Sequence, residues 1–147
     1  MQNLNLNLEN EFFGKRIIVT GASRGLGAVT CEALAKRGAK IAMLARSKKD
    51  IDSLRKKFKN PFDHISIKTD LLKSSEIKLA IKKAKNFLKE IDIVLHIAGG
   101  GFGLKEVLIN DDDLDKLFQV NLRSAIEINR LIVKGKKKKQ SLKIIHV

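Results

Sequence analysis

The stretch "VTGASRGLG", Val19 to Gly27, places three glycines directly after a run of β-branched residues and at the start of a helical pattern. The run "RIIVT" at 16–20 has the length and the Ile and Val content of a buried strand. The residues after the glycines have helical periodicity to about Arg37 and stop at Gly38, which is typical of a helix C-terminus. A glycine-rich turn between a strand and a helix gives a diphosphate access to unpaired N–H groups at the helix N-terminus. The stretch therefore predicts a strand–loop–helix unit that binds a phosphate.

The same alternation of short strands and longer helical segments continues to the end of the chain. Runs rich in Ile and Val predict five strands, at 16–20, 40–45, 64–69, 92–98 and 142–147. The helices between them begin at N-caps, which we expect at Ser47 with Asp50 reciprocating, at Ser74 or Ser75, and at Asn110. Such alternation predicts right-handed βαβ units. The expected fold class is therefore α/β, a doubly wound parallel sheet with helices on both faces.

Length and composition bound the organisation of the chain. Its 147 residues suit one domain, and we expect an N-terminal arm over 1–14 and a nucleotide-binding domain over 15–147. No apolar run approaches the roughly 20 residues of a membrane-spanning helix, and the N-terminus lacks the pattern of a secretion signal. These features predict a soluble, cytoplasmic protein with no membrane partner. The single cysteine, Cys31, excludes an internal disulfide, and its apolar neighbours predict a small buried side chain.

The net charge of +14 would suit a polyanionic partner. The lysines are spread over several predicted helices, however, and only Lys134–Gln140 forms a dense run. That run falls between a predicted helix and a predicted strand, which favours a solvated connection. It also lacks the interleaved aromatic residues on which single-stranded nucleic acids usually stack their bases. Nucleic-acid binding is therefore the least favoured of the functions that we consider.

Several motifs resemble those of the short-chain dehydrogenase/reductase family. The segment "TGASRGLG" at 20–27 is similar to the cofactor loop of that family, and "TDL" at 69–71 resembles its aspartate segment after the third strand. The segment "HIAGGG" at 96–101 resembles the family's N-N-A-G motif, and "FQVNL" at 118–122 resembles its helix-four motif. Order and spacing agree from Lys15 onward. The resemblance implies a Rossmann fold and hydride transfer between a nicotinamide cofactor and a small carbonyl or alcohol substrate.

The resemblance also implies which residues form the site. It assigns the diphosphate to the glycine loop, the adenine to Asp70, and support of the catalytic proton relay to Asn121. With only three histidines in the chain, we find no metal-ligand cluster of sensible spacing. The predicted cofactor-contacting residues are Gly21, Ser23, Arg24, Gly25, Leu26, Gly27, Arg46, Asp70, Leu71, Ala98 and Gly99.

Charge at the end of the second predicted strand indicates which cofactor binds. A site selective for NAD usually has a carboxylate at this position, whereas the additional phosphate of NADP requires cations. The strand ends in "LARS" at 44–47, which contains Arg46 and no acidic residue. Arg24, in the glycine loop, is expected to project toward the same region. Two guanidinium groups suit a phosphate, so the sequence favours NADP(H) over NAD(H).

Two further positions need interpretation. His96 and Ile97 replace both asparagines of the N-N-A-G motif, and His96 is either a proton carrier or, as for most lone histidines at a strand end, a structural residue. Asn121 falls within an apolar stripe formed by Leu114, Leu117, Phe118, Ala125, Ile128 and Ile132. We therefore expect a buried amide that must bond to backbone or water, because an unpaired buried amide costs about 1–3 kcal/mol.

The residues that would move the proton are missing from the sequence. In this family the proton donor is a tyrosine whose pKa is lowered by a lysine four residues later, and a serine holds the carbonyl. This chain contains no tyrosine, and it ends at Val147, where the resemblance places strand five. We therefore expect the cofactor-binding half of a reductase, without the C-terminal strands and helices of the family. Strand five should be an edge with an uncovered face, which predicts low stability or self-association.

Three hypotheses follow from the sequence. The leading one is an NADP(H)-dependent oxidoreductase, present here as a truncated N-terminal part that lacks the serine and the Tyr-x-x-x-Lys motif. The alternative is a noncatalytic nucleotide-binding module, which would bind cofactor without turning over any carbonyl substrate. The third is a basic nucleic-acid-binding protein, whose affinity would fall steeply with salt. The oligomeric state is left open, a homo-oligomer included.

Overall fold

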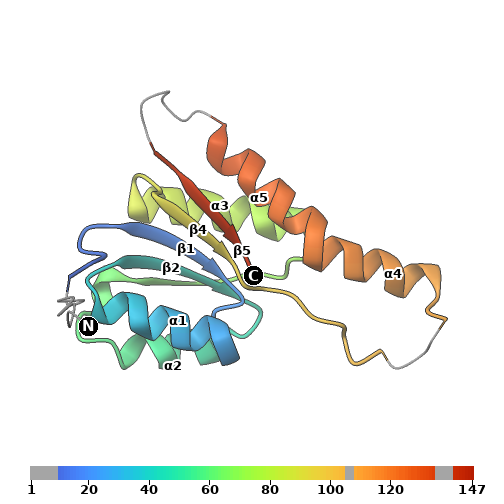
Figure 1. Ribbon diagram of the computed structural model, residues 1–147, viewed down its shortest axis with the longest axis horizontal. Helices are drawn as coiled ribbons and strands as arrows, with labels where there is room; N and C mark the ends of the chain where they lie inside the picture. Colours follow the sequence, from blue (N-terminus) through green and yellow to red (C-terminus); the bar gives the residue numbers. More distant parts are fainter. Residues whose placement is uncertain (1–9, 105–107, 135–140) are drawn as a thin grey trace, which may run out of the picture.

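A parallel sheet forms the centre of the molecule. The computed structural model describes residues 10–104, 108–134 and 141–147. The strands are β1 (Arg16–Thr20), β2 (Lys40–Ala45), β3 (Ile65–Lys68), β4 (Ile93–His96) and β5 (Lys143–His146). All pairings are parallel, and the order across the sheet is β3-β2-β1-β4-β5 (Figure 1). The doubly wound α/β fold predicted from the sequence is thereby confirmed.

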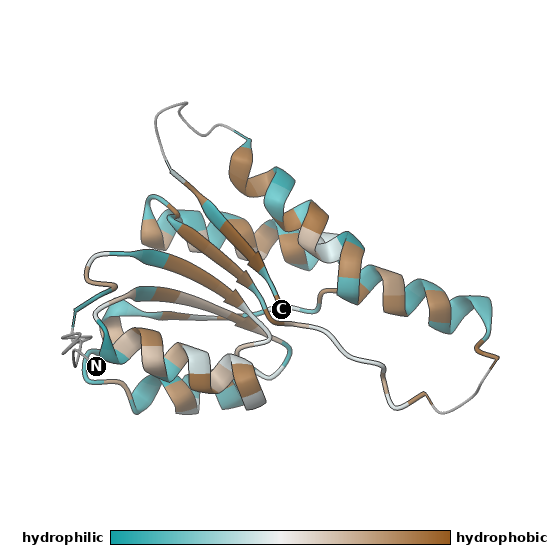
Figure 2. Ribbon diagram, viewed as in Figure 1, coloured by the Kyte–Doolittle hydropathy of each residue, from teal (hydrophilic) through white to brown (hydrophobic). Residues whose placement is uncertain are grey.

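Helices cover both faces of this sheet. They are α1 (Gly25–Lys36), α2 (Lys48–Lys56), α3 (Ser74–Leu88), α4 (Asp111–Phe118) and α5 (Ser124–Val133), with a short 3-10 turn η1 (Pro61–Asp63) and a π-helical segment η2 (Gln119–Arg123). Helices α1 and α2 pack on one face, and α3 and α5 pack on the other (Figure 1). The apolar residues concentrate in the strands and on the helix faces that meet them (Figure 2).

Alternation along β1 divides the core into two layers. Ile17 and Val19 belong to the cluster under α1 and α2, and Ile18 belongs to the cluster under α3 and α5. Cys31 of α1 is buried in the first of these clusters, as predicted, and burial raises its pKa to about 12. A thiol in such surroundings is a small apolar packing residue.

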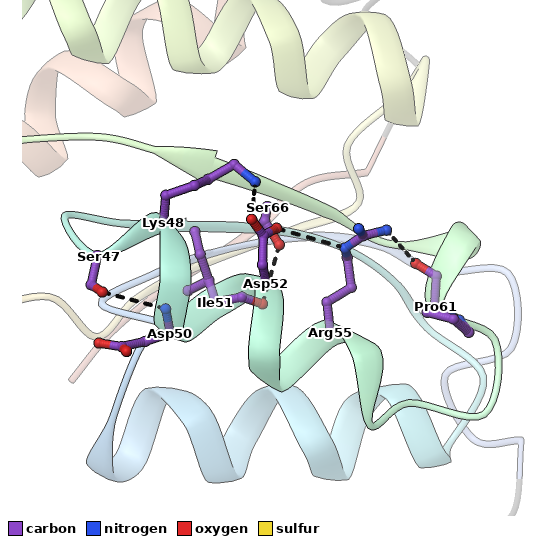
Figure 3. A network of polar contacts seen from close by, with 8 residues as sticks. All are labelled: Ser47, Lys48, Asp50, Ile51, Asp52, Arg55, Pro61 and Ser66. Carbon is purple, nitrogen blue, oxygen red and sulfur yellow. Dashed lines mark hydrogen bonds and ion pairs between the residues drawn. The ribbon is translucent and has the colours of Figure 1, made fainter.

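Side-chain contacts fix the position of α2 on the face of the sheet that it shares with α1 (Figure 3). The Ser47 hydroxyl accepts a hydrogen bond from the Asp50 amide at 3.3 Å, which confirms the predicted cap of this helix. The Ser66 hydroxyl of β3 donates to the Ile51 carbonyl at 3.2 Å, and Arg55 donates to a carbonyl of η1 at 3.0 Å. These contacts cap the start of α2, join Ile51 in the helix to β3 and join its last turn to η1.

The other predicted caps have different outcomes. Asn110 caps α4, since its side-chain oxygen accepts from the Asp113 amide at 2.9 Å. The prediction of a cap at Ser74 or Ser75 is wrong, because Lys73 is the N-cap of α3 and Ser74 is already helical. The Ser74 hydroxyl instead donates to Glu127 of α5, a residue that is distant in the sequence. The Ser74 side chain therefore bonds to another helix instead of capping its own.

The expected burial of the fourth helical stripe is correct for only half of its length. Ala125, Ile128 and Ile132 of α5 are buried against the sheet, whereas Leu114 is 39% exposed and Phe118 is 47% exposed. The physical reason is that α4 extends beyond the sheet, where the described residues provide no surface to cover it (Figure 1). The prediction that Asn121 is buried is therefore wrong, because this residue is exposed.

Parts of two predictions fall outside the described residues. These are the first nine residues of the expected N-terminal arm and residues 135–140 of the lysine-rich run. In the arm, the Phe12 amide donates to the Arg37 carbonyl at 3.0 Å, so this part of the chain packs beside the end of α1. Within the described residues, no helix combines the length and the apolar character that crossing a membrane requires.

Candidate nucleotide-binding cleft

A cleft of about 410 Å³ opens at the carboxyl ends of the strands. It lies where the strand order reverses between β1 and β4, the place at which doubly wound sheets bind ligands. Every residue predicted to contact a cofactor lines it, namely Gly21, Ser23, Arg24, Gly25, Leu26, Gly27, Arg46, Asp70, Leu71, Ala98 and Gly99. The structure thus brings together residues from four separate loops.

The cleft also has lining residues that the sequence analysis missed. These are Leu44, Ala45, Thr69, Leu72, Ile97, Gly100, Phe102, Val120 and Val147. Several of them lie at or just after the carboxyl end of a predicted strand. The rule that parallel sheets bind ligands at those ends was therefore a signal that would have found them. Val120 and Phe102 had no such signal, because they enter the cleft from a helix and from a long loop.

The three glycines of the loop have different structural tasks. A Cβ at Gly21 would lie 2.7 Å from the Ala98 amide nitrogen, and one at Gly27 would lie 2.1 Å from the Gly21 carbonyl oxygen. These two positions are therefore glycine because the protein packs against itself there. Gly25 differs, since a Cβ there would meet nothing within 4 Å, although its φ of +53° favours glycine. Gly25 leaves open space on the cleft side of the loop.

The N-terminus of α1 is suited to an anion. Arg24 is the N-cap residue and makes no side-chain capping bond, and the first turn contains no acidic residue. The first N–H groups of a helix have no partner within the helix and carry partial positive charge. Together with the open space at Gly25, this end of the helix fits a diphosphate group.

Thr20 joins the glycine loop to the loop after β4. Its buried hydroxyl oxygen accepts hydrogen bonds from the Ile97 amide at 3.2 Å and from the Ala98 amide at 3.1 Å. The two loops that meet at Gly21 and Ala98 are therefore locked together by one side chain. The sequence analysis gave Thr20 no role beyond its place in the motif.

Among the described residues that line the cleft, three have charged side chains. Arg24 and Arg46 are exposed, and both line the cleft. Arg24 lies in the loop after β1, and Arg46 lies in the loop after β2. Asp70 is the one acidic residue among the described residues that line it. Its carboxylate accepts from the Leu72 amide at 3.0 Å, and its own amide donates to Glu76 at 2.8 Å. That bond and the ammonium of Lys73 lower the pKa of Glu76, so its carboxylate remains ionised.

Asn121 lies beside the cleft within the π-helical segment η2. Its side-chain oxygen accepts from the Gly100 amide at 2.9 Å, and its amide group donates to the carbonyls of Gly100 at 3.1 Å and Leu117 at 3.0 Å. The expected backbone bonds are therefore present even though the residue is exposed. Asn121 fixes the loop that follows β4, the wall of the cleft opposite Asp70.

His96 turns away from the cleft. It is buried, its Nε2 lies 2.8 Å from Asn129 Oδ1 on α5, and its ring stacks on His146 with centroids 4.5 Å apart. Burial, with a smaller effect from His146, lowers the pKa of His96, so the ring is neutral near pH 7. His96 is not a lining residue of the cleft, and its contacts are those of a structural residue. They join β4 to β5 and α5.

The fold and the position of the cleft together are typical of the α/β proteins that bind dinucleotides. The family model described as short chain dehydrogenase matches residues 15–147. The chain belongs to the short chain dehydrogenase family. The outcome confirms the resemblance drawn from the motifs.

Individual relatives agree with this assignment. The ketoacyl reductase HetN of Nostoc sp. (strain PCC 7120) is 27% identical over 135 residues, which cover 91% of this chain and 47% of HetN. A mutant short-chain dehydrogenase/reductase of Serratia marcescens has a TM-score of 0.78 at 27% identity, covering 92% of this chain and 55% of the other. A 3-ketoacyl-(acyl-carrier-protein) reductase of Brucella melitensis, complexed with NADH, has the same fold at a TM-score of 0.75 and 22% identity, covering 84% and 50%. The chain spans about half the length of each of these three relatives.

Proposed function

We propose that this chain binds NADP(H) in the cleft and is the cofactor-binding part of an oxidoreductase acting on small carbonyl or alcohol compounds. The single observation that supports the cofactor most directly is the shape and charge of the cleft. It combines an uncapped helix N-terminus, open space at Gly25 and two arginines at its rim. A bound nicotinamide cofactor supplies or accepts the hydride. The residues named below hold it.

Each part of the cleft suits one part of the cofactor. The glycine loop and the first turn of α1 suit the diphosphate, because their N–H groups are unpaired and no side chain blocks the approach. Arg24 and Arg46 suit the 2′-phosphate that distinguishes NADP from NAD. The Asp70–Leu71 loop lies on the same side as Arg46 and suits the adenine. Ala98 and Gly99 form the wall joined to β1 through Thr20.

We assign cofactor binding, and not proton transfer, to these residues. Reduction of a carbonyl needs a proton donor near the reacting oxygen. The 147 residues contain no tyrosine, and His96 is directed into the core rather than into the cleft. The second candidate is a module that binds the nucleotide without reducing any carbonyl compound. Turnover of NADPH with any of a panel of aldehydes and ketones would exclude this second candidate.

Arg46→Asp tests the choice of cofactor. A charge-assisted hydrogen bond contributes about 1.5–3 kcal/mol, so its replacement by repulsion should weaken NADPH binding at least tenfold. NADH lacks the 2′-phosphate, so its affinity should stay the same or improve. Calorimetric titration of the full chain with each nucleotide measures both. Equal losses for the two nucleotides would remove the phosphate assignment.

The control makes the same change of charge away from the cleft. Lys82 is an exposed residue of α3 and does not line the cleft. Lys82→Asp should reduce the affinity for both nucleotides only slightly and equally, since distant exposed charges are screened by salt. If this variant discriminates between NADPH and NADH as Arg46→Asp does, the effect is one of net charge and not of the site.

A further inference from the structure

The π-helical segment η2 holds both side walls of the cleft. The Gln119 side-chain amide donates to the Leu71 carbonyl, in the loop after β3, at 3.1 Å. Two residues later, Asn121 bonds to both backbone groups of Gly100, in the loop after β4. Val120, between them, lines the cleft itself. One short segment therefore lines the cleft and holds the loops after β3 and β4 on its two sides.

Helix geometry explains how adjacent residues reach such different places. Each residue turns by about 100° in an α-helix and by somewhat less in a wider π turn, so side chains two apart point to nearly opposite sides. Gln119 and Asn121 therefore point to opposite sides of Val120. Wide π turns of this kind occur frequently at functional sites.

The loop held by Gln119 otherwise depends on local bonds. The Asp70 amide donates to Glu76 at 2.8 Å, and the Leu72 amide donates to the Asp70 carboxylate at 3.0 Å. These bonds shape the turn, but they come from the same stretch of chain and do not fix its distance from the rest of the cleft. Gln119 lies 48 residues further along and joins this turn to the helix on the other side. The Leu71 side chain is buried in the core, and the Leu71 carbonyl is bonded to Gln119, so both groups of this residue hold the turn in place.

We infer that Gln119 is a positioning residue that sets the place of the Asp70–Leu71 loop and thereby the affinity of the cleft for the adenine end of its nucleotide. This inference rests on the proposed function, because it concerns the same cleft. Gln119 itself does not line the cleft and acts through the Leu71 carbonyl. Loss of its donor frees the turn to move without changing the glycine loop.

Two probes separate this role from a general structural one. Adenosine 2′,5′-bisphosphate contains the adenine and the 2′-phosphate, and nicotinamide mononucleotide contains neither. Gln119→Met keeps the length of the side chain and removes the donor. It should weaken the bisphosphate about five- to tenfold, the usual effect of one lost hydrogen bond, and leave the mononucleotide within about twofold. NMR titration of the full chain measures both affinities.

The matched control is Arg123→Met in the same π segment. Arg123 is exposed and pairs with Asp115 at 3.6 Å, away from the cleft. This variant should leave both affinities within about twofold. Should Gln119→Met fail to fold, Gln119→Asn serves instead, because its amide is one methylene too short to reach Leu71 and the same split is expected.

The outcomes are distinguishable. If the wild-type chain binds neither probe, the proposed function fails and the inference falls with it. If the wild type binds the bisphosphate and the Gln119 variants bind it equally well, Gln119 does not position the loop and only the inference is overturned. An equal loss for both probes overturns it as well, since that result means a general loosening of the cleft.

Discussion

Replacing Thr20 by valine tests how the two main loops of the cleft are held together. The Thr20 hydroxyl is buried and accepts hydrogen bonds from the amides of Ile97 and Ala98, at 3.2 and 3.1 Å. Valine has nearly the same shape but no acceptor. Thr20→Val therefore leaves two amide groups without their partner while the packing of the strand is preserved.

The magnitude follows from the environment of those two amides. A buried donor that loses its partner costs about 1–3 kcal/mol. Ile97 and Ala98 are half-buried, and Ala98 lines the cleft, where water replaces part of what is lost. We therefore expect a loss of about 2 kcal/mol in the free energy of unfolding, together with weaker NADPH binding because the β4 loop moves. Urea unfolding followed by circular dichroism measures the first, and calorimetric titration measures the second.

Thr69→Val is the matched control for this experiment. Thr69 is equally buried directly after β3, but its hydroxyl only donates to the Ile67 carbonyl at 3.2 Å. Removing this hydroxyl leaves no amide without an acceptor, so the expected loss in the free energy of unfolding is below about 1 kcal/mol. Equal costs for the two variants, or a neutral Thr20→Val, would refute the argument that the Thr20 acceptor holds the loops together.

The remaining predictions concern the glycine loop, acid stability and the sheet edge. Gly21→Ala should unfold the chain or lower the free energy of unfolding by more than about 3 kcal/mol, because its Cβ would meet backbone at 2.7 Å. Gly25→Ala should lower it by only about 1 kcal/mol, because of its positive φ, but should still weaken NADPH binding. A larger loss of stability in Gly25→Ala would contradict this reasoning. Burial lowers the pKa of His64 from 6.5 to about 4, so the free energy of unfolding should fall by up to about 3 kcal/mol as the pH drops from 6.5 toward 4. In His64→Leu this dependence of the free energy of unfolding on pH should flatten, and an unchanged dependence would disprove the prediction. Ile145, 46% exposed on the edge strand β5, should promote self-association, so Ile145→Lys should shift sedimentation toward the monomer; identical sedimentation of the two proteins argues against the edge as the contact.

Much of the fold was predictable because its signals are local. The five strands follow from short Ile- and Val-rich runs, and the structure shortens the predicted 92–98 to Ile93–His96 because the chain turns into the cleft wall after His96. The caps at Ser47 and Asn110 follow from residue types that bond to their own backbone. The placement of the predicted cofactor residues along one cleft follows from the alternation of strands and helices, which brings the carboxyl ends of parallel strands together.

What the sequence missed depends on contacts between distant residues. Periodicity showed that Leu114 and Phe118 share a face with α5, but it could not show whether another surface covers that face. The cap expected at Ser74 was lost to Glu127, which lies 53 residues away. His96 was left with two interpretations until Asn129 and His146 were seen beside it. The contact of Gln119 with a backbone carbonyl had no sequence signal, because such a bond does not depend on the side chain of Leu71.

The claim that this cleft binds a nicotinamide nucleotide is tested most directly by an NMR titration of the ¹⁵N-labelled full chain with NADPH. We expect saturable binding, with the largest shifts in the amides of the Gly21–Gly27 loop, of Arg46, of the Asp70–Leu71 turn and of Ala98 and Gly99. Absence of binding, or shifts centred on the lysines of α3 instead of the cleft, would contradict it.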